Sequence, residues 1–180
     1  QHCYIQALKV CTKEDKQLQS TIYASLALFY YQCDQIKAMF QCLQYAQSND
    51  PSNINTWYIQ GIYNTQFVVV NTTNEKKINK KVLPATIYAF EMVLECGSYN
   101  TFLAHYMLAY LHYITNDDDD DDESLIKAHY HVEKASQLLY GSGGDSQKKK
   151  NEYGLKTLQI AIHQARKQYK LACDHHYINI

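Results

Sequence analysis

The chain has 180 residues and a formal net charge of −1 at pH 7, so no global field would recruit nucleic acid or an anionic membrane. Hydrophobic residues make up 46% and charged residues 19%, as in an ordinary globular domain. With only 6 Gly and 2 Pro, the composition favours long helices over an all-β fold with many tight turns.

The sequence starts at Gln1 with residues that read as a helix over 1–12, so we expect a fragment of a longer protein. No apolar run reaches the length of about 18 residues that a transmembrane helix needs. Neither CxxC nor zinc-finger spacing occurs, which favours reduced, buried thiols in an intracellular, cytoplasmic protein. The cysteines are Cys3, Cys11, Cys33, Cys42, Cys96 and Cys173.

Residues 20–53 predict two antiparallel helices, which we call helix A and helix B. Small and bulky residues recur at helical spacing in both halves. In helix A they are Tyr23, Leu26, Ala27 and Tyr30, and in helix B they are Met39, Leu43 and Ala46. Asp50-Pro51 should end helix B, because the residue before proline disfavours α geometry.

Residues 54–101 repeat this pattern with an insertion. Trp57 and Gly61 follow Tyr23 and Ala27 at one fixed period, since 57 − 23 = 34 and 61 − 27 = 34. Helix B would supply Thr86, Phe90, Val93 and Ser98, with Pro84 in its first turn. An insertion therefore lies near 68–81, which we expect to be a surface loop, and it carries Lys76, Lys77, Lys80 and Lys81.

Residues 102–142 form a third copy. Helix A would carry His105, Leu108, Ala109 and His112, and helix B would carry Ala128, Val132, Ala135 and Tyr140. An acidic insertion at 116–123 contains Asp117 to Asp122. A flexible linker follows at Gly141 to Asp145, and apolar spacing then predicts a further helix over 152–173.

The 34-residue period resembles the tetratricopeptide repeat, in which a bulky residue, Leu-Gly and an aromatic mark helix A. The segment 20–53 fits throughout with Ala27 in place of Gly, whereas Gln60 and Asn64 depart from the pattern. The resemblance implies an all-α, right-handed solenoid of antiparallel helix pairs with about eight helices. That single solenoid segment would cover 1–180, with 1–19 ending a preceding repeat and 143–180 forming a linker and C-terminal helix.

The resemblance also implies a concave face on which partners bind. The family's ligand-facing positions on helix A include seven apolar or aromatic residues: Leu28, Tyr31, Tyr58, Ile62, Tyr106, Tyr110 and Tyr113. Tyrosine offers large contact area and a hydroxyl for hydrogen bonds, so these residues suit a polypeptide segment, although packing against neighbouring helices is the alternative. No Lys or Arg occupies these positions, which argues against a carboxylate clamp for chaperone tails.

The sequence contains no motif that is typical of catalysis or of metal binding. GxGxxG, P-loop, GxSxG and HExxH are absent, so we expect no enzyme activity and no cofactor. His129-x-His131 cannot easily share a helical metal site, and we interpret the histidines as surface or packing residues. The acidic run lacks the spacing of an EF-hand and favours a solvated loop, with a cation site or a docking element for a basic partner as alternatives.

The sequence therefore favours a protein–protein interaction scaffold within a multiprotein complex. One alternative is a regulatory or substrate-docking domain of an enzyme whose catalytic part lies elsewhere. Another is RNA binding through the lysine-rich loops, although nucleic acid is not the favoured partner. We expect no membrane partner.

Overall fold

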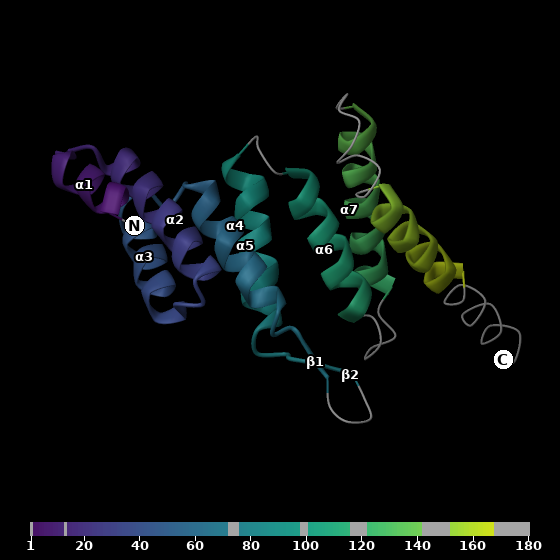
Figure 1. Ribbon diagram of the computed structural model, residues 1–180. Coiled ribbons are helices and arrows are strands. Elements are labelled where there is room, and N and C mark those ends of the chain that lie inside the picture. The colour runs from purple at the N-terminus through teal and green to yellow at the C-terminus, as the bar shows by residue number, and fades with distance from the viewer. Residues whose placement is uncertain are drawn as a thin grey trace, which may run out of the picture. The chain divides into compact units, whose positions relative to one another are not determined.

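A computed structural model describes residues 2–12, 14–71, 76–97, 101–115, 122–141 and 152–167. Within these ranges the chain forms eight helices, which confirms the all-α class, and one short hairpin. The chain divides into two compact units, Gln1–Gly97 and Ser98–Ile180 (Figure 1). The first unit contains α1 (His2–Val10), α2 (Lys16–Gln32), α3 (Ile36–Asn49), α4 (Ile54–Thr65), β1 (Val69–Asn71), β2 (Lys76–Ile78) and α5 (Leu83–Cys96).

Helices α2 and α3 form an antiparallel pair, as predicted for 20–53. Asp34 takes a positive φ of 56° in the short connection, which lets the chain reverse tightly. The Ser20 hydroxyl donates to the carbonyl of Ala46 over 2.8 Å and so joins the start of α2 to the end of α3. Asp50 is extended before Pro51, which confirms the predicted end of the helix.

Helices α4 and α5 form the second pair (Figure 1). The Asn53 side chain caps α4 by accepting from the backbone N–H of Asn55 over 3.1 Å. Its amide group also donates to the Ser20 hydroxyl over 2.8 Å and ties the second pair to the first. Pro84 stands in the first turn of α5, as predicted.

The insertion expected as a surface loop contains an antiparallel hairpin. Val69 of β1 lies opposite Ile78 of β2. Val68 is fully buried, and its carbonyl accepts from the backbone N–H of Asn79 over 2.7 Å. The insertion is therefore anchored in the core, because a buried valine at its base offsets the cost of ordering the hairpin.

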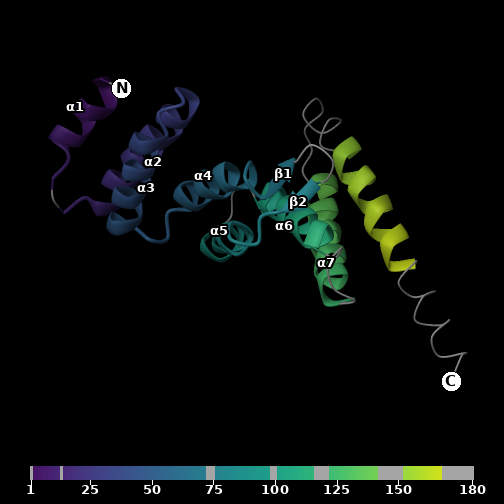
Figure 2. The same ribbon diagram turned by 90° about the horizontal axis from the view of Figure 1, so that it is seen from below.

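The second unit contains α6 (Thr101–Thr115), α7 (Asp122–Gly141) and a C-terminal helix at 152–167 (Figure 2). Its core combines buried residues of all three helices: Ala109, Ala128, Val132, Ala135, Leu139, Leu155, Leu158 and Ile162. The C-terminal helix packs through Leu155, Leu158 and Ile162, three apolar residues at helical spacing that bury one face.

The core uses the same positions in every helix pair. The small residues of helix A, Ala27, Gly61 and Ala109, are all buried. Each helix B buries a triad at spacings of four and three: Met39, Leu43 and Ala46; Thr86, Phe90 and Val93; Ala128, Val132 and Ala135. These predicted core positions are confirmed.

The cysteines differ in burial from the expectation. Cys42 is buried, but Cys3 and Cys33 are exposed, so the expectation of buried thiols is wrong for those two. All described cysteines are free. No described helix combines the length and apolarity that crossing a bilayer requires. Helix α7 includes Asp122, Glu123 and Gly141, so the acidic insertion and the linker were predicted too long by these residues. The remaining parts of these predictions, at 116–121 and 142–145, lie outside the described residues, as do Ser98, the side chain of Tyr140 and the end of the predicted C-terminal helix at 168–173.

Candidate partner-binding surfaces

The first unit holds four of the predicted partner-binding residues, on α2 and α4. Leu28 is the most accessible, with 43% of its surface exposed. Tyr31, Tyr58 and Ile62 are half-buried. Tyr31 and Tyr58 also pack against the core of α2, α3 and α4, so each has both an interior and an accessible side.

The hydroxyl groups of Tyr58 and Tyr31 lie in different environments. Desolvation raises the pKa of the Tyr58 phenol and keeps it neutral as a hydrogen-bonding group. The Tyr31 hydroxyl accepts a hydrogen bond from the Gln66 side-chain amide, which restrains the end of α2 against the end of α4. The Tyr31 ring is therefore positioned before any partner binds.

The second unit holds the other three residues, Tyr106, Tyr110 and Tyr113 of α6. All three are half-buried and pack against the core shared with α7 and the C-terminal helix. A Cβ built on Gly154 would lie 3.3 Å from the Tyr106 hydroxyl, so the C-terminal helix approaches this ring closely. The packing role that the sequence left open therefore applies to these tyrosines at least in part.

A cluster of aromatic rings, not singled out by the sequence, occupies one end of the first unit. Tyr63 of α4 lies at its centre, with ring centroids 5.1 Å from Phe40, 5.0 Å from Phe67 and 6.4 Å from Tyr31. Phe40 and Phe67 remain 36% and 45% exposed. Tyr63 and Phe67 are four residues apart, a helical spacing that could have predicted their contact but not the approach of α3.

Three histidines meet between α6 and α7. The Nδ1 atoms of His105 and His131 are 2.9 Å apart, and the ring of His112 stacks on His131 at a centroid distance of 5.8 Å. A hydrogen bond between these two nitrogens needs one donor and one acceptor, so the two rings cannot both carry a proton on Nδ1. The packing role expected for these histidines fits, because His112 is buried.

The environment of the cluster disfavours protonation. Desolvation, followed by the neighbouring His105 and His112, lowers the pKa of His131 to about 4. Desolvation also lowers the pKa of His105, with a further contribution from Lys134. For His112, desolvation and Lys127 lower the pKa against the opposing effect of Glu123.

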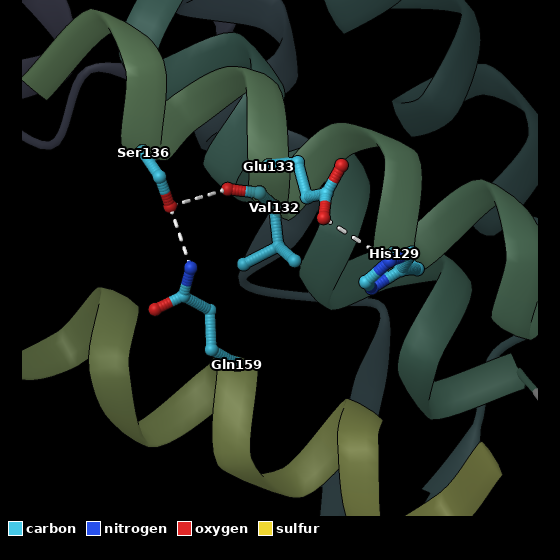
Figure 3. A network of polar contacts seen from close by, with 5 residues as sticks. All are labelled: His129, Val132, Glu133, Ser136 and Gln159. Carbon is cyan, nitrogen blue, oxygen red and sulfur yellow. Dashed lines mark hydrogen bonds and ion pairs between the residues drawn. The ribbon is translucent and has the colours of Figure 1, made fainter.

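A polar network joins α7 to the C-terminal helix (Figure 3). The Gln159 amide donates to the Ser136 hydroxyl over 2.7 Å, and that hydroxyl donates to the Val132 carbonyl over 2.9 Å. His129 lies 3.3 Å from the Glu133 carboxylate one turn along the same helix. His129 is thus separate from the three-histidine cluster, and the network serves to align two helices.

Metal-ligating side chains do not converge in the part of the chain that is described. There, no group of three or more His, Cys, Asp or Glu residues is arranged to hold an ion. Glu123, which follows the acidic run, lies 2.6 Å from the Lys127 ammonium and stabilises the first turns of α7. The chain matches no protein-family model, no curated protein and no solved structure with which it was compared.

Proposed function

We propose that the chain is a protein-interaction module of the tetratricopeptide type, a right-handed solenoid segment that binds a polypeptide rather than a catalytic domain. The single observation that carries this proposal is the shared register of its helix pairs. Ala27, Gly61 and Ala109 are all buried at the small-residue position of helix A. Small residues there allow close helix approach, which is what stacking repeats require.

The accessible apolar residues of helix A support polypeptide binding. Leu28 is exposed, and Tyr31, Tyr58 and Ile62 are only half-buried. Because none of these positions carries a charge, the contact would use apolar area and tyrosine hydroxyls rather than ion pairs. We place the partner among the subunits of an intracellular assembly.

The two units would contribute unequally. Tyr106, Tyr110 and Tyr113 already contact the core that includes the C-terminal helix. Tyr31 and Tyr58 likewise pack against the core of the first unit, whereas Leu28 of α2 is exposed. We therefore propose that the first unit provides the principal binding surface, with Leu28 at its most exposed point.

The test is affinity capture of partners with the parent chain, with Leu28→Ser, and with Tyr58→Ala combined with Tyr110→Ala. Loss of the captured partners from variants that still unfold cooperatively supports the proposal. Leu28→Ser serves as the mild variant, because an exposed leucine can be replaced with little effect on folding. Tyr153→Ser is the matched control, since Tyr153 is 78% exposed on the C-terminal helix and outside the proposed face.

Salt provides a second criterion. An uncharged contact should change little between low and moderate ionic strength, whereas nucleic-acid binding falls steeply. The proposal would be contradicted by partners that remain bound to Leu28→Ser and to the variant that combines Tyr58→Ala with Tyr110→Ala, and that dissociate in moderate salt.

A further inference from the structure

We propose that one end of the first unit is a docking surface that adjoins the proposed helix A face, shares Tyr31 with it, and binds an acidic polypeptide segment through an apolar anchor side chain of that segment. We call it the basic aromatic end. It consists of Tyr31, Phe40, Tyr63, Phe67, Lys37, Lys77, Lys80 and Lys81. The inference rests on the proposed function, polypeptide binding, and adds the chemistry of the bound segment.

The aromatic part of this surface is contiguous and partly open to solvent. Tyr63 contacts Phe40 and Phe67, which come from α3 and from the turn after α4. Phe40 and Phe67 keep 36% and 45% of their surface exposed. Contiguous exposed aromatic surface of this kind is typical of sites that receive an apolar side chain.

The rings are held in place by the ends of three helices. Tyr31 stands in the last turn of α2, Phe40 in the first half of α3 and Tyr63 in the last turn of α4. The hydrogen bond from the Gln66 amide to the Tyr31 hydroxyl connects two of these ends. A preformed surface binds with a smaller entropic cost than one that must be ordered by its ligand.

Lysines border the rings on two sides. Lys37 precedes Phe40 by three residues on α3, so both side chains lie on neighbouring parts of one helix face. The hairpin follows Phe67 directly, and the hydrogen bond from the Asn79 backbone N–H to the Val68 carbonyl brings its second strand back to this point. The exposed lysines of the hairpin region are Lys77, Lys80 and Lys81.

Charge is separated along the helices of the first unit. Asp34, in the turn between α2 and α3, is the acidic residue described at the basic aromatic end. The opposite helix ends carry acidic residues: Asp15 before α2, Asp50 after α3 and Glu95 in the last turn of α5. A chain with a net charge of −1 thus presents a local basic surface, and this complementarity selects an acidic partner.

The ring geometry favours a peptide over a single-stranded nucleic acid. Phe40 and Tyr31 meet Tyr63 nearly perpendicularly, with interplanar angles of 88° and 84°. In an edge-to-face contact the edge of one ring rests on the face of the other, so the cluster does not present the row of parallel ring faces on which successive bases stack. Ring edges bordered by ammonium groups suit an aliphatic or aromatic side chain flanked by carboxylates.

The experiment selects binders from a phage-displayed library of random peptides on the full chain. Enriched peptides are then synthesised with a fluorescent label and titrated in anisotropy measurements. We expect Asp and Glu around one apolar residue in the enriched sequences. Binding should weaken about tenfold or more with Phe67→Ser, and also with Lys80→Gln combined with Lys81→Gln.

Two variants of matched chemistry serve as controls. Tyr45→Ser removes an exposed ring on α3 that stacks on Tyr23 instead of joining the Tyr63 cluster. Lys9→Gln combined with Lys16→Gln removes the same amount of charge from α1 and the start of α2. Both control variants should bind the selected peptides like the parent.

The possible failures can be told apart. Peptides that bind the Phe67 and lysine variants like the parent but are lost with Leu28→Ser would overturn this inference and leave the proposed function intact. If no peptide is enriched, this inference falls, whereas the proposed function is decided by the capture of partners with the parent and Leu28→Ser. Oligouridine that competes for the surface and is lost with the same variants would replace the acidic peptide with a nucleic acid.

Discussion

Gly61 of α4 lies directly against the ring of Phe90 of α5, and a Cβ placed on Gly61 would come within 2.9 Å of Phe90 Cζ. Gly61 is buried and Phe90 is fully buried, so neither side can move without disturbing the core. Glycine at this position lets the two helices approach until the ring of Phe90 fills the space that a side chain would take.

Gly61→Leu should therefore destabilise the first unit by roughly 1–3 kcal/mol or more, because overpacking forces side chains or helices apart. Thermal unfolding of both proteins measures the effect. Combining Gly61→Leu with Phe90→Leu should recover part of the loss, since the smaller partner leaves room. A melting temperature equal to that of the parent would show that this contact is not close in solution.

Val68 provides a second stability test at the base of the hairpin. Val68→Ala should cost about 1–2 kcal/mol, because it removes two buried methyl groups from a fully buried side chain. Lys81→Ala, at an exposed position just after the hairpin, should have a much smaller effect, since surface substitutions usually change stability by no more than about 0.5 kcal/mol. Chemical denaturation of both variants compares them. If the Val68 variant is as stable as the parent, the insertion is a surface loop that is not anchored in the core.

Thr56 should tolerate, or gain from, loss of its hydroxyl. Its side chain is fully buried, and within the described residues Oγ1 has no hydrogen-bond partner. Thr56→Val has the same shape without the buried polar atom, so it should leave stability unchanged or raise it by about 1 kcal/mol. Thr56→Ser keeps the hydroxyl, loses a methyl group and should destabilise. A destabilised valine variant would mean that the hydroxyl is bonded in solution.

The histidines between α6 and α7 should make the second unit sensitive to acid. The pKa of His131 falls from 6.5 in a free side chain to about 4 in the folded chain, so the unfolded state binds more protons between these values. Stability is complete above pH 6.5 and decreases as the pH falls towards 4. With solvent screening considered, this residue should contribute a loss of about 1–2 kcal/mol.

His131→Gln isolates that contribution. The variant removes the titrating group, so its melting temperature should fall less between pH 7 and pH 4.5 than that of the parent. His129→Gln is the control, because His129 pairs with Glu133 outside the cluster. If the parent and the His131 variant lose the same stability on acidification, the cluster does not govern the response.

Much of the fold follows from residue spacing alone. The recurrence of small residues at 27, 61 and 109 and of the buried triads in each helix B predicted which faces are internal. Asp50-Pro51 and Pro84 predicted helix boundaries, because proline restricts its own backbone and that of its predecessor. These features are local or periodic, so a short stretch of sequence holds all the information that specifies them.

The candidate surfaces could be predicted only in part. The resemblance to the repeat family selected Leu28 and Tyr58 as candidates, but their exposure depends on how closely each neighbouring helix packs. The Tyr63 cluster joins residues from three elements, and the contact between His105 and His131 spans 26 residues of sequence. No spacing rule within one element reaches that far.

The sequence by itself determined the helical class, the 34-residue register, the internal face of each helix and the absence of charge on the helix A face. Only the tertiary structure decided that the insertion is a hairpin anchored by Val68, that Phe40 and Phe67 meet at Tyr63, and that the tyrosines of α6 pack beside the C-terminal helix. The physical reason is that periodicity states which side of a helix avoids water, whereas the partner that covers it depends on contacts between distant segments.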